Sequence, residues 1–260
     1  MITASSSKAS NRPAIATASV ASDAVVAVRD LQFRWRSDRP LLLDLPELTV
    51  APGETLYLRG PSGSGKSTLL ALLGGVLIPQ RGSVRLLGTN VGNLPRARRD
   101  GFRADHVGFI FQLFNLIPYL GVVDNVTLPC RFSARRRARL QQQGSTVETE
   151  ARRLLARLDL DDDELLRQPV TELSVGQQQR VAAARALIGG PELVIADEPT
   201  SALDSDRRSA FLELLSAECS AACAALIFVS HDPSLGSQFG RTVDLADLNR
   251  ATSMLSRAQA

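Results

Sequence analysis

Short apolar runs separated by turn residues occupy the first third of the chain after residue 23. The stretches AVVAVRDLQFRW (24–35) and ELTVAPGETLYLRG (47–60) each hold such runs, and Pro52 and Gly53 interrupt the second one. A third stretch, GSVRLLG (82–88), has glycine at both ends. Apolar runs bounded by turn residues are typical of strands. We therefore predict a hairpin-like antiparallel β region here.

A helical period replaces this pattern further along. In STVETEARRLLARLDL (145–160), Ser145 and Glu148 have the spacing of a capping box, and five apolar residues fall on one helical face. That face consists of Val147, Ala151, Leu154, Leu155 and Leu158. Arginines also gather in this region, at Arg96, Arg98, Arg99, Arg135, Arg136, Arg137 and Arg139. We predict an inserted helical subdomain at about residues 95–180.

Helices and apolar strands alternate from residue 177 onward. The runs LVIA (193–196) and ALIFVS (225–230) are short and apolar, and helical segments precede them. Such alternation implies a parallel sheet. The predicted fold class is therefore α/β, with a parallel-sheet core, an antiparallel β subdomain and the inserted helical subdomain.

Composition and charge narrow the classes of protein. The 260 residues are 44% hydrophobic and 22% charged, as in ordinary globular proteins, and suffice for one large domain or for one domain with an inserted subdomain. The net charge of +3 mildly favours anionic partners, but a solvated arginine surface explains it as well, and we expect no nucleic acid partner. No apolar run reaches the roughly 18 residues that span a bilayer, so we expect the chain not to cross a membrane by itself.

Residues 1–23 differ in composition from the rest of the chain. They are rich in Ser, Ala and Thr and contain no acid before Asp23. Because such a segment cannot build a core, we predict a disordered tail, followed by one domain over 24–260. A cleaved signal is the alternative, but the segment lacks a continuous apolar region.

Three cysteines complete the inventory of reactive groups. Cys130, Cys219 and Cys223 lack the spacing of a disulfide framework, which suits a reducing compartment. Cys219 and Cys223 lie four residues apart on a predicted helix. They are either a metal pair or two small buried thiols.

A glycine-rich loop connects a predicted strand to a predicted helix. GPSGSGKST (60–68) has the phosphate-loop spacing, in which backbone N–H groups and the helix dipole converge on phosphate oxygens. Lys66, the only lysine after the tail, would reach the β- and γ-phosphates, and the Ser67 hydroxyl would bind Mg²⁺. A glycine-rich turn without a ligand is the alternative. The predicted nucleotide-binding residues are Gly60, Pro61, Ser62, Gly63, Ser64, Gly65, Lys66, Ser67 and Thr68.

Two acids and a histidine follow the later apolar strands. Asp197 and Glu198 end the strand in LVIADEP, the first placed to orient the water shell of magnesium and the second to polarise an attacking water. They could instead cap the next helix. His231 follows the next strand, in FVSHDPS, where it can bond the γ-phosphate or the attacking water, and its strand is expected to neighbour that of Glu198. His106, in RADHVGF, is assigned a structural role.

The ordered set GPSGSGKST, FQLFNLIPYL, LSVGQQQR, LVIADEPTSALD and VSHD resembles the ATP-binding subunit of an ABC transporter, over about residues 26–248. Five motifs in one order are more specific than any single one. The resemblance implies a P-loop NTPase core, ATP and Mg²⁺ as ligands, ATP hydrolysis, and a head-to-tail homodimer or pseudo-dimer of ATPase subunits.

The stretch LSVGQQQR (173–180), here called the signature stretch, contains no metal ligand and no nucleophile. In the family that it resembles, this helix start binds the ATP held by the phosphate loop of the other subunit. Ser174, Gly176 and Gln177 would therefore contact nucleotide in trans through hydrogen-bond donors and helix-end charge. Val175 stands in place of the usual glycine, and because valine does not readily adopt positive φ, the fine geometry of turnover is in question.

The resemblance assigns three more residues. Gln112 matches a glutamine that meets magnesium and the attacking water and that links the site to a membrane subunit. Trp35 falls where the family places an aromatic ring against adenine, although a half-buried core tryptophan is an alternative. Asp204, at the end of SALD, resembles part of a loop that crosses the dimer interface.

The segment GFIFQLFNLIPYLGVVDNVTLP is most similar to the branch that serves lipoprotein release, macrolide export and cell division. Its apolar side chains would either form a groove for a cytoplasmic helix of the membrane subunit or pack inside the insertion. These residues are Phe114, Leu116, Ile117, Tyr119 and Leu120.

The resemblance implies a peripheral subunit on the cytoplasmic face of the inner membrane, energising substrate movement by separate transmembrane permease subunits. A regulatory ABC ATPase that signals through a membrane partner without transport is the alternative. DNA-repair and chromosome-organising ATPases carry long coiled coils or zinc modules, which this sequence lacks. A kinase would leave LSVGQQQR and VSHD without a role.

Overall fold

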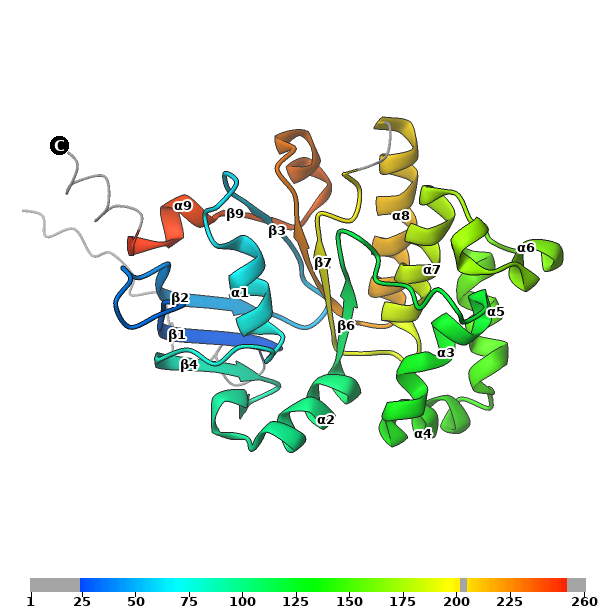
Figure 1. Cartoon of the computed structure of the whole chain (residues 1–260), viewed down its shortest axis with the longest axis horizontal. Coiled ribbons are helices and arrows are strands. Elements are labelled where there is room, and N and C mark those ends of the chain that lie inside the picture. Colours follow the sequence, from blue (N-terminus) through cyan, green and yellow to red (C-terminus); the bar gives the residue numbers. More distant parts are fainter. Residues whose placement is uncertain (1–23, 202–204, 252–260) are drawn as a thin grey trace, which may run out of the picture.

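Two sheets and a group of helices make up the fold in this computed structural model, which describes residues 24–201 and 205–251 (Figure 1). The tail predicted at residues 1–23 lies outside the described residues, and so does Asp204. The two sheets lie side by side along the long axis of the molecule, and most of the helices after β6 lie beyond the second sheet (Figure 1).

The N-terminal sheet is antiparallel, as the sequence predicts, with strand order β2-β1-β4-β5. Its strands are β1 (Val26–Phe33), β2 (Leu43–Val50), β4 (Arg81–Leu86) and β5 (Thr89–Asn90). Gly82 has a φ of 77°, and a Cβ at this position would lie 2.2 Å from the carbonyl oxygen of Asp30. A glycine is therefore needed where β4 passes an irregularity in β1.

The second sheet is parallel and has strand order β6-β7-β8-β3-β9. Its strands are β3 (Thr55–Arg59), β6 (Val107–Ile110), β7 (Leu193–Asp197), β8 (Ala225–Val229) and β9 (Arg241–Asp244). All five residues of β8 are buried, as expected for a strand that is covered on both faces. Because parallel strands end at the same edge, the loops after β3, β6, β7 and β8 meet there.

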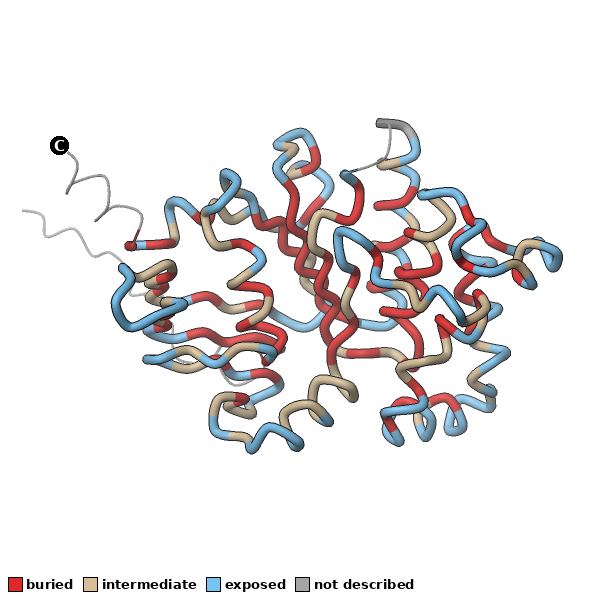
Figure 2. Tube along the Cα trace, viewed as in Figure 1, coloured by how far each residue is buried: buried red, intermediate tan, exposed pale blue. Residues whose placement is uncertain are grey.

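Each face of the parallel sheet packs on a separate apolar core. Leu56 and Leu58 share a core with helix α1 (Lys66–Leu73), which also packs on the antiparallel sheet. Tyr57, from the same strand, faces the other core with α7 (Val175–Leu187) and α8 (Ser205–Ala221). Figure 2 shows the buried residues concentrated along these strands. Helices α1 and α7 therefore lie on opposite faces of the parallel sheet.

The helices predicted at about residues 95–180 are present, but a strand interrupts them. They are α2 (Arg96–His106), α3 (Val122–Phe132), α4 (Ala134–Gln142), α5 (Val147–Arg157), α6 (Asp163–Arg167) and the start of α7. Strand β6 lies inside this range and pairs with β7, so α2 precedes the sheet and α3 to α6 follow it. The short elements η1 (Val91–Asn93), η2 (Val170–Glu172), η3 (Pro233–Gln238) and α9 (Leu245–Leu248) complete the description.

Helix α5 buries its predicted apolar face but begins at a different cap. Ala151, Leu154 and Leu155 are buried. Thr146 is the N-cap, and its hydroxyl accepts the N–H of Thr149 at 3.1 Å. The predicted Ser145–Glu148 capping box is therefore wrong, because the neighbouring threonine offers an equivalent hydroxyl one residue closer to the helix.

The cysteines differ from the prediction at one position. Cys130 and Cys219 are buried, and burial raises the pKa of the Cys219 thiol to about 12. Cys223 is exposed with a φ of 51°, because α8 ends at Ala221. The two cysteines therefore do not form a buried pair. Over residues 24–201 and 205–251, no group of three or more His, Cys, Asp and Glu residues could hold a metal ion.

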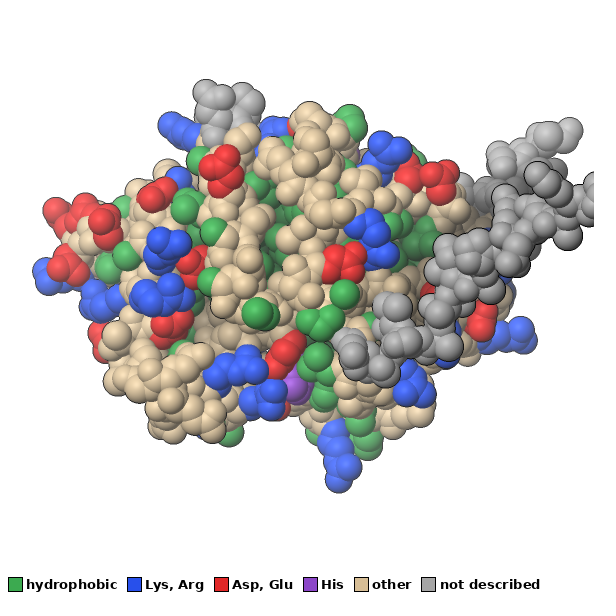
Figure 3. Space-filling view, turned by 180° about the vertical axis from the view of Figure 1, so that it is seen from behind, with side chains coloured by type: hydrophobic (Ala, Val, Ile, Leu, Met, Phe, Trp, Pro, Cys, Tyr) green, Lys and Arg blue, Asp and Glu red, His purple; other side chains and the backbone are tan. Residues whose placement is uncertain are grey.

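Many of the arginines are engaged in the fold rather than simply solvated. Arg136 is only 2% exposed and donates to the carbonyl groups of Ala104, Val107 and Ile188. On the face drawn in Figure 3, side chains of both signs are interspersed. In the described part of the chain, no helix is long and apolar enough to cross a membrane.

Candidate functional site

The loop from Gly60 to Gly65 turns tightly between β3 and α1. Gly65 is the N-cap of α1 with a φ of 98°, and a Cβ there would lie 2.9 Å from a methyl carbon of Leu43. No side chain caps α1, and its first turn holds no acid, so the first N–H groups lack an intrahelical partner. The hydroxyl of Ser64 is buried without a partner as well. A phosphate group would satisfy this set of donors.

The side chain of Lys66 folds back over this loop. Its ammonium group donates to the carbonyl oxygen of Gly60 at 2.8 Å and to that of Pro61 at 3.0 Å. Lys66 is 6% exposed, so these bonds replace most of its hydration. An ammonium group has three donors, which leaves one for a phosphate oxygen.

Ser67 and Asp197 connect the phosphate loop to the end of β7. The hydroxyl of Ser67 lies near enough to the carboxyl group of Asp197 to act on its pKa. Burial raises the pKa of Asp197 and the charge of Glu198 adds to this effect, while the Ser67 hydroxyl and the charge of Lys66 oppose it. Mg²⁺ prefers oxygen ligands, and a hydroxyl beside a carboxyl group supplies two of them. These residues therefore fit a magnesium ion.

Glu198 and His231 come together from neighbouring strands. Oε2 of Glu198 lies 3.2 Å from Nδ1 of His231, and the N–H of Glu198 donates to the carbonyl of Val229 at 3.0 Å. The pairing of β7 with β8 brings about this contact, as the sequence predicts for these two strands. Glu198 has a φ of 46°, an uncommon conformation for a residue other than glycine. Its conformation turns the chain directly after Asp197.

Gln112 and Trp35 are exposed residues. Gln112 lies in a turn after β6, at the same edge of the parallel sheet as the acids. Trp35 is 62% exposed and contacts the ring of Phe33 edge-on, with the ring centroids 5.3 Å apart. The alternative of a half-buried core tryptophan is therefore wrong, because the loop after β1 carries the ring out of the sheet.

The signature stretch begins α7 with a capping box. The N–H of Ser174 donates to Oε1 of Gln177 at 2.8 Å, and the N–H of Gln177 donates to the Ser174 hydroxyl at 3.3 Å. Gln177 thus caps the helix in this structure. Val175 is the first helical residue and does not have a positive φ, so the strain expected for valine is absent. Ser174 and Gly176 line a cavity of about 240 Å³ that α8 closes on one side.

The structure therefore separates the predicted site residues into two groups. The phosphate loop, Asp197, Glu198 and His231 lie together at the edge of the parallel sheet. The signature stretch begins α7, which packs on the face of that sheet opposite α1.

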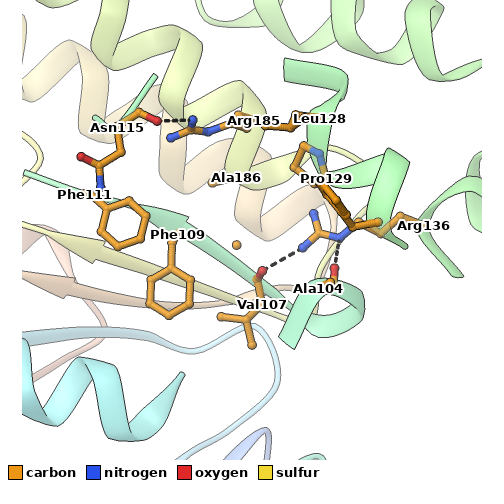
Figure 4. Close-up of a pocket in the computed structure, with 12 residues that line it drawn as sticks. Ala104, Val107, Phe109, Phe111, Asn115, Leu128, Pro129, Arg136, Arg185 and Ala186 are labelled. Atoms are coloured by element: carbon orange, nitrogen blue, oxygen red, sulfur yellow. Dashed lines mark hydrogen bonds between the residues drawn. The ribbon is translucent and has the colours of Figure 1, made fainter. Parts of the chain in front are cut away.

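Arg185 and Asn125, to which the sequence assigns no role, hold the loop after Gln112. Arg185 of α7 donates to the carbonyl groups of Phe114 and Asn115, both of which have positive φ. Figure 4 shows the bond to Asn115. Asn125 is fully buried in α3, where its side chain accepts the N–H of Ile117 at 2.7 Å. Its amide nitrogen, which has two N–H donors, lies 3.1 Å from three carbonyl oxygens of the same loop. In both cases the sequence feature that could indicate such a role is a polar residue among the apolar residues of a helix.

A cavity of about 250 Å³ opens beside this loop, between β6, α3 and α7 (Figure 4). Its walls are mainly apolar and include Phe109, Phe111, Leu128, Pro129 and Phe132. Phe132 is 73% exposed and Phe111 is 39% exposed, so apolar surface reaches solvent here. We call this cavity the α3 groove.

The apolar residues predicted to form a groove are not among those that line the α3 groove. Phe114 is buried and packs in the core, which is the alternative of packing inside the insertion. Leu116 packs against the same core. Tyr119 is 85% exposed, and Ile117 and Leu120 are half-buried.

Known proteins share this arrangement. A family model described as ABC transporter matches residues 43–201. The macrolide export ATP-binding/permease protein MacB of Chromobacterium violaceum is 39% identical over 84% of this chain and 33% of its own length. The lipoprotein-releasing system ATP-binding protein LolD 1 of Caulobacter vibrioides is 38% identical over 77% of this chain and 82% of its own. The chain spans about a third of the length of the MacB relatives.

A solved structure agrees with these relatives. The ATP-binding cassette MJ0796, a dimer in a post-hydrolysis state bound to ADP and Pi, superposes with a TM-score of 0.74 at 30% identity. The match covers 87% of this chain and 95% of that one. The order of its motifs, its two sheets and these relatives together establish that the chain belongs to the ABC transporter family, as one of its ATP-binding and ATP-hydrolysing cassettes.

Proposed function

We propose that the chain energises substrate movement by separate membrane subunits through a cycle of ATP binding and hydrolysis. The contact between Glu198 and His231, beside the phosphate loop, is the observation that carries this proposal. Glu198 accepts the proton of the attacking water, and His231 bonds the γ-phosphate or that water. Lys66 binds the β- and γ-phosphates with the donor that its two carbonyl bonds leave over.

Mg²⁺ would be held by Ser67, Asp197 and Gln112, where it would neutralise charge on the phosphates. The Ser67 hydroxyl lies near the Asp197 carboxyl group, and Gln112 lies at the same edge of the sheet. Trp35 stacks on adenine in this proposal, for which its exposed ring is suited.

The active form is a head-to-tail dimer in which Ser174 and Gly176 of one subunit complete the ATP site of the other. The positions of α1 and α7 on opposite faces of the parallel sheet support this, because the signature stretch is remote from its own phosphate loop. The dimeric state of MJ0796 gives independent support. ATP drives closure only because it binds the closed dimer more tightly than the open one. Asp204 remains a predicted interface residue outside the described part.

The α3 groove is the docking surface for a helix of the membrane subunit on the cytoplasmic side of the inner membrane. Its apolar walls suit the apolar face of an amphipathic helix. The loop that ends at Asn115 borders the groove, and Arg185 joins this loop to α7. Movement of the signature helix would therefore reach the groove directly.

A charge placed in the groove tests this arrangement. Phe132→Glu should retain the basal ATPase rate but lose binding to the purified membrane subunit in nanodiscs, because a carboxylate replaces an exposed apolar contact. Val76→Glu, which alters an exposed apolar residue outside the groove, is the matched control and should bind normally. Equal binding by both variants would contradict docking at the α3 groove.

A regulatory ATPase without transport is distinguished by reconstitution with the membrane subunit in vesicles. Transport predicts that movement of a substrate across the vesicle membrane depends on ATP and stops with Glu198→Gln. The regulatory role would be favoured if the membrane subunit stimulates ATP hydrolysis but no tested substrate crosses the vesicle membrane.

A further inference from the structure

The hydroxyl of Tyr57 lies against the backbone on both sides of His231. It donates to the carbonyl oxygen of Asp232 at 2.6 Å and lies 3.3 Å from that of Ser230. A phenol has a single proton, so the shorter bond to Asp232 is the dominant one. Tyr57 belongs to β3, three residues before Gly60, whereas His231 follows β8. The hydroxyl therefore ties the turn that carries the histidine to the strand that leads into the phosphate loop.

Aromatic packing fixes the position of this hydroxyl. Tyr57 is fully buried, and its ring centroid lies 6.5 Å from that of Phe228 and 5.4 Å from that of Phe239. Phe228 and Phe239 also contact one another at 5.2 Å. Burial raises the pKa of Tyr57, so the phenol remains a protonated donor at neutral pH. A buried ring with a single polar end can hold a partner at a defined place.

Other bonds shape the same turn through the side chain of Asp232. Its carboxylate accepts the N–H of Ser234 at 3.0 Å and the Ser234 hydroxyl at 2.6 Å, and it pairs with Arg208 of α8. The bond from Tyr57 differs from these because it reaches the main chain, and it comes from the strand of the phosphate loop.

We propose that Tyr57 is a positioning residue for ATP hydrolysis, which holds His231 in line with Glu198 by anchoring the Asp232 carbonyl group to β3. The proposal rests on the role of His231 proposed above. Tyr57 is buried beneath the turn and acts through the histidine rather than on the nucleotide. A change in the turn alters the 3.2 Å contact between His231 and Glu198 while leaving the phosphate loop intact.

Tyr57→Phe removes the hydroxyl and keeps the ring. In the full-length protein, we expect kcat for ATP hydrolysis to fall about five-fold, the scale of one lost hydrogen bond, with an unchanged KM for ATP. In a His231→Ala background, the same change should have no further effect, because the route through the histidine is already lost. Thr242→Val is a matched control, since it removes another hydroxyl that bonds a carbonyl, that of Gly236, and should leave kcat unchanged.

The histidine can also be observed directly. The chain has two histidines, so selectively labelled protein gives two imidazole signals by NMR. Tyr57→Phe should shift the signal of His231 and leave that of His106, which is held by Glu192, as an internal reference.

The outcomes separate this proposal from the proposed function. An unaltered kcat in Tyr57→Phe beside a strongly impaired His231→Ala would overturn the role of Tyr57 alone. A five-fold loss that persists in the His231→Ala background would also overturn it, because Tyr57 would then act by another route. Normal turnover of His231→Ala would overturn the role of the histidine and, with it, that of Tyr57.

Discussion

The carboxylate of Glu198 lies 3.2 Å from Nδ1 of His231, although the two residues are 33 positions apart in the chain. The pairing of β7 with β8 accounts for this contact, and the exposures of the two side chains differ. Glu198 is 19% exposed and His231 is 63% exposed. A shielded carboxylate with an accessible histidine beside it is suited to accept a proton from a water that arrives with the nucleotide.

Glu198→Gln should therefore bind ATP normally and hydrolyse it at least about 10²-fold more slowly, because the amide cannot accept the proton. Because ATP stays bound, the dimer of this variant should accumulate, and size-exclusion chromatography should resolve it from the monomer. Glu172→Gln, at an exposed acid in η2, is a control for the loss of one negative charge. Near-normal turnover of Glu198→Gln would contradict its role as the base.

Lys66→Ala should lose nucleotide affinity and reduce hydrolysis by about 10²-fold or more, on the scale of removing a charge-stabilising group. The buried ammonium group holds two carbonyl groups of the loop, so its loss also loosens the phosphate site. Equilibrium titration with a fluorescent ATP analogue measures the affinity. Arg59→Gln removes a nearby exposed cation and should bind ATP as the native chain does; equal affinity of Lys66→Ala would refute the assignment.

Mixing two inactive variants tests completion of the site in trans. Ser174→Arg should still bind ATP at its own phosphate loop but fail to dimerise and hydrolyse, because a bulky cation replaces the hydroxyl at the start of α7. Excess Lys66→Ala subunit is added to form mixed dimers. In a head-to-tail mixed dimer, both substitutions lie in one composite site, and the other site keeps its native Lys66 and Ser174. Hydrolysis should therefore return in the mixture. An ATPase rate no greater than the sum of the separate variants, with mixed dimers demonstrated, would argue against completion in trans.

Stability should depend on pH through Glu192. Burial alone would raise the pKa of Glu192, but hydrogen bonds from His106 and Arg135 and the charge of Arg139 outweigh it and lower the pKa from 4.5 to about 2. A carboxyl group with a lowered pKa in the folded state contributes its stability above its unfolded pKa and loses it as pH falls. The loss should occur between pH 4.5 and about 2 and amount to about 3 kcal/mol.

Denaturant unfolding across this pH range measures the contribution. Glu192→Gln should be less stable than the native chain at pH 6, and the two should converge as pH approaches 2. Glu148→Gln is the control, because Glu148 forms only an exposed pair with Arg152, and it should change stability by less than about 0.5 kcal/mol. A constant difference between Glu192→Gln and the native chain from pH 6 to pH 2 would show that the carboxylate does not stabilise the fold through its charge.

The elements that position the site could be predicted because the residue patterns that indicate them are short and continuous in the sequence. The glycine spacing of the phosphate loop and the acids after an apolar strand each depend on a few consecutive residues. The pairing of β7 with β8 also followed from strand alternation. The contacts of Arg185 and Tyr57 could not be predicted, because each joins positions about 70 or 175 residues apart. Strand β6 was missed since four residues, one of them Gly108, give too short a pattern.

Helix caps are a second feature that the sequence alone did not fix. Ser145 and Thr146 offer similar hydroxyl groups at adjacent positions, so the sequence alone does not decide which of them caps α5. Phe114 likewise lies in an apolar segment, whose pattern does not show which of its side chains are buried.

The solitary state of Lys66 has a chemical consequence. Because it is the only lysine after residue 23, the folded domain offers amine-reactive reagents a single ε-amino group, and that group lies within the phosphate loop. Its two carbonyl partners and its 6% exposure should make acylation of this amine slow in the resting protein. The rate of acylation at Lys66, followed by mass spectrometry of one peptide, would then report directly on how often the loop opens and on how far a bound nucleotide shields it.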